Sequence, residues 1–318
     1  MAKNRDWNRE ESEHGKYASV TEDDIVRQAK IISLSGPDDS SNRALHGGAL
    51  PPGATLLGVG ASLEEFDLEK IREEEPNVLF CAPSCPKARA QLPKILEAFP
   101  SIEWVHARSA GIDFIVSDEL AASSVTLTNA KGQFSSTLAE YTMMACSYFA
   151  KDLSRLMRQK NDREWVKYDV EELRGKTMGI VGYGDIGRSC AKLANAYGMK
   201  ITALRRNPDK YSKDPLCDIV YGTGTANLNK LMSESDYVVC STPLTAETRG
   251  MINADAFHAL KENAVFINLG RGPVVDEEAM ISALKDRKLK GAALDVFTVE
   301  PLPEDSELWD LDNVLISP

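Results

Sequence analysis

Three closely spaced glycines are the clearest sign of chemistry in this chain. Residues 178–187 read Met-Gly-Ile-Val-Gly-Tyr-Gly-Asp-Ile-Gly, so Gly182, Gly184 and Gly187 form a G-x-G-x-x-G pattern. In a dinucleotide site the first glycine allows a tight turn, the second lets the backbone approach the pyrophosphate, and the third lets the helix pack on the strand. A short apolar run precedes the loop and apolar residues at helical spacing follow it, which favours that use. The predicted cofactor contacts are Gly182, Tyr183, Gly184, Asp185, Ile186 and Gly187.

The residue after the next strand has the wrong charge for an NAD(H) site. Such sites place an acidic residue about 20 positions after the glycines, where it accepts hydrogen bonds from the adenosine ribose 2′-hydroxyl. In this chain the strand expected at 201–204 leads to Arg205 and Arg206, and Arg205 lies 18 residues after Gly187. Two arginines suit a 2′-phosphate. We therefore predict NADP(H) as the cofactor, with NAD(H) as the alternative if both arginines are solvated loop charges.

Three charged residues follow other predicted strands. Ligands of open parallel sheets bind beyond the carboxyl ends of the strands. Arg271 lies between two glycines after the apolar run 264–269, where it could bind a carboxylate through two hydrogen bonds. Asp295 and Glu300 follow the strand residues Ala292-Ala293-Leu294, and Glu300 is held by a proline-rich turn. The alternatives are a structural ion pair for Arg271 and a solvated loop acid for Glu300.

Two further loops could contact ligands. The small residues Ala110 and Gly111 could present backbone N–H groups to an anion, although alone they indicate only a turn. Thr242 and Pro243 follow a strand that ends at Cys240, and they could contact the cofactor or simply close the strand.

Bulk composition restricts the class of protein. A chain of 318 residues with 43% apolar and 27% charged residues is expected to form two globular domains. The formal net charge of −11 argues against nucleic acid or an anionic membrane as the main partner. No apolar stretch is long enough to span a bilayer.

The N-terminus and the cysteines favour a cytoplasmic location. Residues 1–14 are polar, with acidic residues and no apolar core, so they match neither a secretory signal nor a transit peptide. The cysteines are scattered along the chain, which is typical of reduced thiols. Cys81 and Cys85 are close together, but no second Cys or His pair completes a metal set, so we expect no metal. The six cysteines are Cys81, Cys85, Cys146, Cys190, Cys217 and Cys240.

Strands alternate with helices along the chain, which predicts an α/β fold with two Rossmann-like, doubly wound parallel sheets. We expect a flexible tail at 1–26, a substrate domain at 27–127 and an NAD(P)-binding domain at 128–318. The first domain lacks a glycine fingerprint, which makes it the substrate half. Strands are expected at 29–34, 55–59, 77–81, 103–107, 177–181, 201–204, 237–240, 264–269, 292–296 and 314–317. Helices are expected at 68–75, 88–99, 136–156, 186–197 and 276–286.

Taken in order, these segments resemble the D-isomer-specific 2-hydroxyacid dehydrogenases. The resemblance covers roughly residues 28–318 and implies a flavodoxin-like substrate domain followed by the NAD(P)-binding domain. It also implies that Arg271 binds the substrate carboxylate and that Glu300 partners a catalytic histidine. Asp295 would contact the nicotinamide carboxamide. The matching segments are Ser109-Ala110-Gly111-Ile112-Asp113, the glycine loop, Thr242-Pro243-Leu244-Thr245, Asn268-Leu269-Gly270-Arg271-Gly272 and Asp295 to Leu302. Ala110 and Gly111 would offer amides to the same carboxylate.

The family's acid/base histidine has no counterpart in this sequence. In the family it directly follows a strand and a proline, in a segment that resembles 313–318, and this chain stops at Pro318. We therefore expect a truncation just before the proton donor, with the family's final helix also missing. The chain's histidines do not match that position: His14, His46, His106 and His258.

These observations predict NADPH-preferring reduction of a small 2-keto acid, of the glyoxylate or hydroxypyruvate type, with Arg271 and Glu300 as catalytic residues. One alternative is an enzyme like 3-phosphoglycerate dehydrogenase, which would need further cationic groups for its phosphate. Another is a catalytically inactive NADP(H)-binding or sensing protein, because the histidine is missing. The resemblance also implies a homodimer packed through the cofactor domain, with the helix from Ser136 as a candidate interface.

Overall fold

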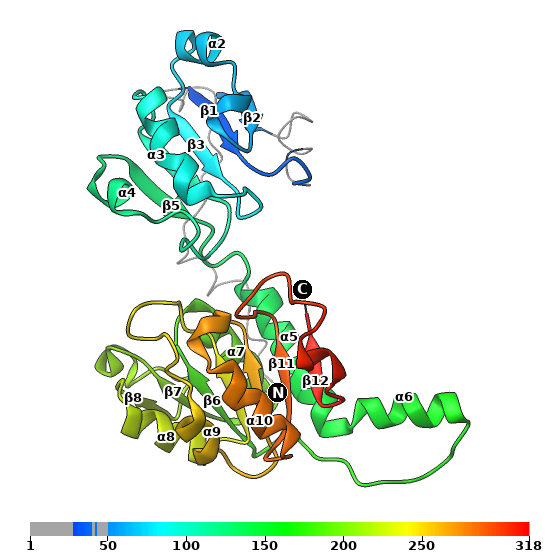
Figure 1. Ribbon diagram of the computed structural model, residues 1–318. Helices are drawn as coiled ribbons and strands as arrows, with labels where there is room; N and C mark the ends of the chain where they lie inside the picture. The colour runs from blue at the N-terminus through cyan, green and yellow to red at the C-terminus, as the bar shows by residue number, and fades with distance from the viewer. Residues whose placement is uncertain (1–27, 40–41, 43–49, 318) are drawn as a thin grey trace, which may run out of the picture. The chain divides into compact units, whose positions relative to one another are not determined.

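The structure, a computed structural model, describes residues 28–39, 42 and 50–317, and its contacts divide the chain into two units (Figure 1). The first unit ends at Ala130 and the second begins at Lys131. The boundary expected from the sequence lay between residues 127 and 128, and the expected tail, 1–26, lies outside the described residues. Within the described part of the chain, no helix is both long and apolar enough to span a membrane.

The first unit is built on a five-stranded parallel sheet with the order β2-β1-β3-β4-β5. This is the flavodoxin-like order, as predicted. Its core is formed by alternate residues of the strands, such as Leu79 and Val105, which pack against Leu92 and Ile95 of α3. The strands are β1 (Ala29–Leu34), β2 (Ala54–Gly60), β3 (Val78–Cys81), β4 (Trp104–Ala107) and β5 (Thr126–Asn129). The helices are η3 (Leu63–Glu65), α2 (Leu68–Glu73), α3 (Ala88–Ala98) and α4 (Asp118–Ala122).

The second unit is a seven-stranded parallel sheet with the order β12-β11-β10-β9-β6-β7-β8. The chain starts at β6, runs outward to β8 and returns to β9 on the other side of β6, so the switch point lies between β6 and β9. The strands are β6 (Thr177–Val181), β7 (Lys200–Leu204), β8 (Ile219–Tyr221), β9 (Tyr237–Cys240), β10 (Ala264–Asn268), β11 (Leu289–Leu294) and β12 (Val314–Ile316). The helices are α5 (Ser135–Lys151), α6 (Leu153–Asp162), α7 (Asp185–Ala196), η4 (Pro208–Tyr211), α8 (Thr225–Glu234), α9 (Ala254–Ala259), η5 (Gly272–Val274), α10 (Glu277–Lys285) and η6 (Glu307–Asp310).

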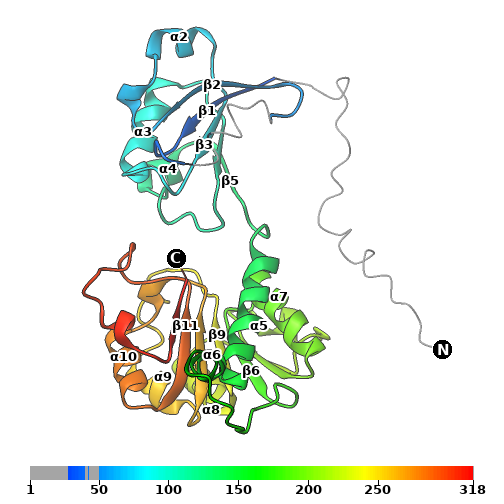
Figure 2. The same cartoon turned by 90° about the vertical axis from the view of Figure 1, so that its right-hand side faces the viewer.

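Helices cover both faces of this second sheet. Figure 2 shows α5 and α7 on one face, with α8, α9 and α10 on the other. The pleat of β10 shows why both faces need cover: Val265 and Ile267 join the core under α5 and α7, and Phe266 joins the core under α8 to α10. The confirmed fold class is therefore α/β with two doubly wound parallel sheets, and both bury their strands.

The prediction of a single helix at 136–156 is wrong. The structure has α5 and α6 with a break at Asp152, whose φ is 48°. The Asp152 side chain accepts a hydrogen bond from the Arg155 N–H (3.3 Å), so it caps the start of α6. The second helix then runs away from the sheet instead of covering it (Figure 1). The strand expected at 292–296 also differs, since β11 begins at Leu289 and ends at Leu294.

Candidate active site

The three loop glycines have three different surroundings. Gly182 has φ +98°, and a Cβ there would lie 2.7 Å from Thr242 Oγ1. A Cβ on Gly187 would lie 2.5 Å from the Gly182 carbonyl oxygen, so α7 packs directly on the turn. A Cβ on Gly184 would meet nothing within 4 Å. These surroundings fit a turn at Gly182, an open approach at Gly184 and helix–strand packing at Gly187.

The loop after β9 holds the glycine loop in place across the switch point. Ser241 Oγ donates to the Gly182 carbonyl oxygen (2.7 Å), and Thr242 Oγ1 donates to the Val181 carbonyl oxygen (2.9 Å). Thr242 is buried, and Pro243 follows it at the surface. The Thr242 side chain is thus fixed to β6. Ser241 also ties this loop to the glycine loop, and the sequence did not single it out.

Helix α7 begins at Asp185, directly after the open glycine. Its first residues, Asp185, Ile186 and Gly187, carry N–H groups that have no carbonyl partner one turn earlier within the helix. Such a terminus favours anions through its N–H groups and through the helix dipole. The carboxylate of Asp185 is in turn neutralised by Lys131, with Nζ 3.6 Å from Oδ2.

Arg205 does not point freely into solvent. It directly follows β7, and its Nη1 donates a hydrogen bond to the Tyr183 carbonyl oxygen in the glycine loop. Its guanidinium carbon lies 3.9 Å from the ring centroid of Tyr211, over the ring. Arg206 is exposed beside it. The structure therefore brings one arginine of the pair onto the glycine loop and leaves the other at the surface.

Two glycines after β10 connect the remaining loops. A Cβ on Gly270 would lie 2.6 Å from the Thr242 carbonyl oxygen, and one on Gly272 would lie 1.9 Å from the carbonyl carbon of Phe297. Arg271 stands between them, and its Nη1 donates to the Gly270 carbonyl oxygen (2.9 Å). The loop ends of β9, β10 and β11 therefore touch, backbone against backbone, around Arg271.

The loop after β11 carries the two predicted carboxylates. Glu300 Oε1 accepts a hydrogen bond from the Phe297 N–H (2.9 Å), which fixes it to the segment that Gly272 contacts. Burial raises the pKa of Asp295, a hydrogen bond with Ser317 lowers it, and the nearby Glu300 raises it further. Burial also raises the pKa of Tyr141 to about 12, with Asp295 adding to the effect. Asp295 is thus half-buried and Glu300 is exposed, and the two carboxylates are close enough for Glu300 to act on the pKa of Asp295.

Ala110 and Gly111 belong to the first unit. The Ala110 carbonyl oxygen accepts from Asn129 Nδ2 (2.7 Å), and the Gly111 carbonyl oxygen accepts from Ser109 Oγ (2.6 Å). In a planar trans peptide the N–H points opposite to the carbonyl. The Gly111 N–H therefore points away from Asn129, so this loop can present an amide on its other side.

Comparison with known proteins identifies the family. The sequence profile described as "D-isomer specific 2-hydroxyacid dehydrogenase, NAD binding domain" matches residues 142–318, more than half of the chain. The chain belongs to this family. A relative, the glyoxylate reductase of Thermofilum pendens, is 34% identical over 233 residues, which cover 71% of this chain and 67% of the relative. Membership in the 2-hydroxyacid dehydrogenase family makes the chain an NAD(P)-dependent dehydrogenase or reductase, as predicted.

Solved structures of the family support the fold. The D-isomer specific 2-hydroxyacid dehydrogenase family protein of Aeromonas salmonicida superposes with a TM-score of 0.75 at 29% identity, covering 92% of this chain and 88% of that one. The enzyme of Xanthobacter autotrophicus, solved with NADPH and MES, superposes with a TM-score of 0.73 at 28% identity and the same coverage.

The two described histidines, His106 and His258, each contact a residue of their own unit. His106 lies in β4, where its Nδ1 is 2.8 Å from Thr128 Oγ1, and burial and Arg108 lower its pKa. His258 is exposed in α9, with Nδ1 3.1 Å from Lys288 Nζ. His14 and His46 are outside the described residues. Among the residues that the structure covers, no group of three or more His, Cys, Asp or Glu side chains could hold a metal ion.

Proposed function

We propose that this chain reduces a small 2-keto acid, of the glyoxylate or hydroxypyruvate type, with a preference for NADPH. The observation that carries the proposal is Arg205, which the hydrogen bond to Tyr183 attaches to the glycine loop at the position where NAD(H) sites have an acid. The exposed Arg206 adds a second positive charge beside it.

The cofactor would fit the second unit. No atom lies within 4 Å of a Cβ built on Gly184, so a pyrophosphate could approach the backbone there, beside the N–H groups of the first turn of α7. In this proposal Arg205 and Arg206 bind the 2′-phosphate, and Thr242 and Pro243 line the site. Asp295 contacts the carboxamide of the nicotinamide. When bound, NADPH supplies the hydride that reduces the keto carbon.

The chain's own residues would position the keto acid. Arg271 binds the carboxylate and polarises the ketone, which combines orientation with electrostatic stabilisation. The resemblance would add the amides of Ala110 and Gly111 as further donors to a substrate carboxylate. By the resemblance, Glu300, with Asp295 close by, would favour the charged form of the family's acid/base histidine, which would give its proton to the keto oxygen.

Replacing Arg205 by serine tests the cofactor preference. We expect the Kd for NADPH to rise about 10- to 100-fold, because a hydrogen bond to a charged phosphate contributes about 1.5–3 kcal/mol. The Kd for NADH should stay within about twofold, since it lacks the phosphate. Fluorescence titration of both nucleotides gives the values, and Arg174→Ser, at the amino end of β6, is the matched control. A wild-type protein that binds NADH as tightly as NADPH would overturn the preference.

Turnover is tested by NADPH oxidation with glyoxylate, hydroxypyruvate and 3-phosphohydroxypyruvate. Reduction of the first two supports the proposal. Preference for the third would favour the 3-phosphoglycerate dehydrogenase alternative. Tight NADPH binding with no turnover of any substrate would instead favour a binding or sensing protein.

We also propose that the chain forms a homodimer through residues 153–170, here named the arm, which comprises α6 and the segment after it. The apolar face of α5, the helix singled out from the sequence, is buried against α7 and the sheet. The arm instead exposes several large apolar side chains, and Trp165 is 95% exposed. These exposed residues are Leu153, Leu156, Met157, Trp165, Val166 and Val170.

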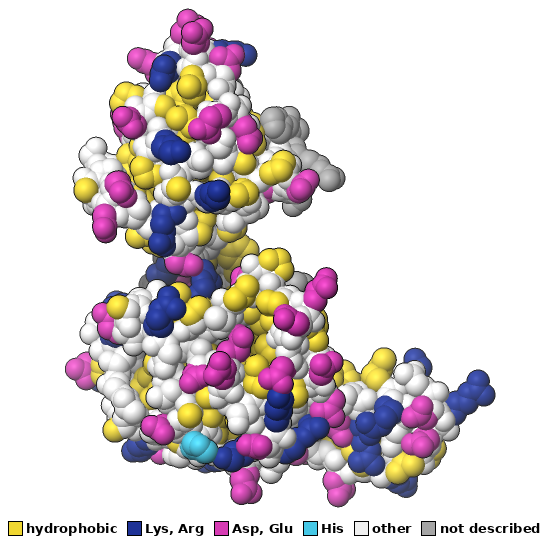
Figure 3. Space-filling view, viewed as in Figure 1, with side chains coloured by type: hydrophobic (Ala, Val, Ile, Leu, Met, Phe, Trp, Pro, Cys, Tyr) yellow, Lys and Arg dark blue, Asp and Glu magenta, His cyan; other side chains and the backbone are white. Residues whose placement is uncertain are grey.

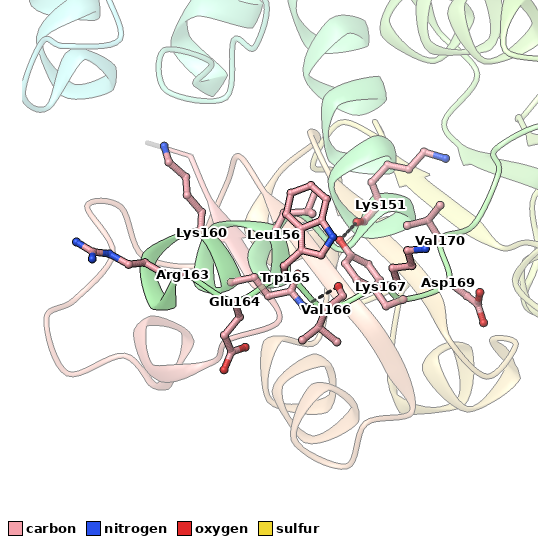
Figure 4. Close-up of a pocket in the computed structure, with 12 residues that line it drawn as sticks. Lys151, Leu156, Lys160, Arg163, Glu164, Trp165, Val166, Lys167, Asp169 and Val170 are labelled. Carbon is pink, nitrogen blue, oxygen red and sulfur yellow. Dashed lines mark hydrogen bonds between the residues drawn. The ribbon is translucent and has the colours of Figure 1, made fainter.

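The arm encloses a cavity and carries side chains of both charges. A cavity of about 1160 Å³ is lined by α6 and the segment that returns from it (Figure 4). Positive and negative side chains alternate with apolar ones on the arm, at the lower right of Figure 3. Glu171 fixes its end to the body through Lys176 Nζ (2.7 Å) and Lys290 Nζ (2.5 Å). Such a surface can pair with a second copy of itself through an isologous contact.

Replacing Trp165 by aspartate is expected to convert the dimer to a monomer at micromolar concentration, because it places a charge among apolar residues at the contact. Size-exclusion chromatography with light scattering distinguishes 34.9 kDa from twice that mass. Tyr197→Ala, which removes an exposed aromatic ring outside the arm, should leave the mass unchanged. A monomeric wild-type protein would contradict the proposal.

A further inference from the structure

Tyr211 stands at the centre of the cationic side chains that follow β7. It is the last residue of η4, and its ring is partly buried against the core under α5 and α7. The Arg205 guanidinium carbon lies over this ring, 3.9 Å from its centroid. Lys210 Nζ is 5.8 Å from the ring centroid, and the Arg188 guanidinium carbon is 6.0 Å from it. A neutral aromatic face thus gathers positive charge where the proposed 2′-phosphate would bind.

The ring is itself held by the glycine loop. Tyr183, the residue between Gly182 and Gly184, is buried and meets Tyr211 edge to face, with centroids 5.9 Å apart and an interplanar angle of 89°. Its carbonyl oxygen accepts the hydrogen bond from Arg205. Tyr183 therefore supports the tyrosine ring with its side chain and the arginine with its backbone.

Arg188 does not compete for the same role. Its Nε donates to Asp214 Oδ2 (2.8 Å), and the Asp214 side chain is almost fully buried. That ion pair neutralises Arg188 at the edge of the cluster. Arg205 is then the guanidinium in closest contact with the ring, and its face and one N–H are both engaged.

From this geometry we propose that Tyr211 is a positioning residue for nucleotide selection, which holds the Arg205 guanidinium ready for a 2′-phosphate. The inference rests on the proposed NADPH preference and deepens it. A guanidinium that lies over a ring and is hydrogen-bonded at one nitrogen loses little further side-chain freedom when an anion binds, so less of the binding free energy is spent on ordering it. Its remaining N–H donors include those that a phosphate needs.

Tyr211→Leu and Tyr211→Phe test this role through binding, without turnover. We expect Tyr211→Leu to raise the Kd for NADPH and for 2′,5′-ADP about tenfold, the equivalent of a partly desolvated cation–π contact. The Kd for NADH and 5′-AMP should stay within about twofold. Tyr211→Phe should bind like the wild type, because the ring remains. Tyr168→Leu is the matched control, since that ring also carries a guanidinium, Arg155 at 4.2 Å, and it lies in the arm and not beside the glycine loop.

Combining the change with Arg205→Ser makes the test specific. In the Arg205→Ser background, Tyr211→Leu should not alter the ratio of the NADPH and NADH dissociation constants further. Equal weakening of both nucleotides, no weakening of either, or a Tyr211→Phe variant as weak as Tyr211→Leu would overturn the positioning role. A wild-type chain without NADPH preference would refute the cofactor proposal and this one together, whereas a preference that Tyr211→Leu leaves intact refutes only this one.

Discussion

Replacing Arg271 by alanine is expected to lower kcat/KM for a 2-keto acid about a thousandfold, since two charge-assisted hydrogen bonds of about 2 kcal/mol each are lost. The residue stands between two glycines at the end of β10, beside the loops that carry Thr242 and Phe297. Because it faces the substrate in the proposed site and not the nucleotide, the Kd for NADPH should change by less than about twofold. Steady-state kinetics and a nucleotide titration on the same preparation give both values.

Arg271→Lys separates charge from geometry. Lysine keeps the positive charge but cannot form the two parallel hydrogen bonds of a guanidinium, so we expect activity between those of the wild type and the alanine variant. Binding of oxamate to the NADPH complex provides a readout that needs no turnover, and it should weaken in the same order. If Arg271→Ala bound oxamate as tightly as the wild type, the carboxylate assignment would be wrong. Thermal unfolding checks that the lost hydrogen bond to Gly270 has not disturbed the fold.

Two central strands, β6 and β9, could be predicted to the residue. The strands at 177–181 and 237–240 are short apolar runs, and the structure places both in the middle of a sheet covered on both faces. Continuous apolar runs are typical of parallel strands for that reason. The edge strand β8 was not predicted, because its three residues are partly exposed and carry little of this pattern.

The sequence pattern did not show where α5 ends. Apolar residues continue at helical spacing past Lys151, so the sequence predicts one helix to residue 156. The break depends on a single aspartate that adopts positive φ and caps the next helix. An aspartate inside an apolar pattern does not by itself distinguish a cap from an exposed side chain. The arm, and with it the proposed interface, could be located only in the structure.

The sequence predicted which edge of the sheet carries the candidate site, but not which residues contact one another there. Parallel strands bring their carboxyl ends to one edge, so residues after β6, β9, β10 and β11 were expected there. The residues that hold these loops together follow no local pattern. Tyr211 is one aromatic residue in a polar loop, and the role proposed for it depends on its distance to Arg205, which the sequence does not show. The approach of Gly272 to Phe297 likewise joins segments that are distant in sequence.

The close contact of Gly272 with Phe297 gives the second prediction, a loss of stability. Gly272→Ala should destabilise the second unit by about 3 kcal/mol, because the new methyl group would overlap backbone atoms and not a side chain that can turn away. The Cβ would lie 1.9 Å from the carbonyl carbon of Phe297, 2.0 Å from its oxygen and 2.3 Å from the Thr298 nitrogen. The loop must therefore move, and Glu300, tied to the Phe297 N–H, moves with it. A displacement of about 1 Å at a reacting group can cost about a hundredfold in rate, so we expect activity to fall as well.

Two other glycines provide the contrast. Gly222→Ala adds a methyl group at ordinary contact distance, 3.7 Å from Pro208 Cγ, and should change stability by less than about 0.5 kcal/mol. Gly184→Ala adds one where nothing lies within 4 Å, so the fold should remain while NADPH binding weakens, because the methyl group enters the space proposed for the pyrophosphate. Urea unfolding and nucleotide titration of the three variants separate the two effects. A Gly272→Ala variant as stable as Gly222→Ala would show that the two loops do not meet as closely as this structure has them, and the link from Arg271 to Glu300 would then be lost.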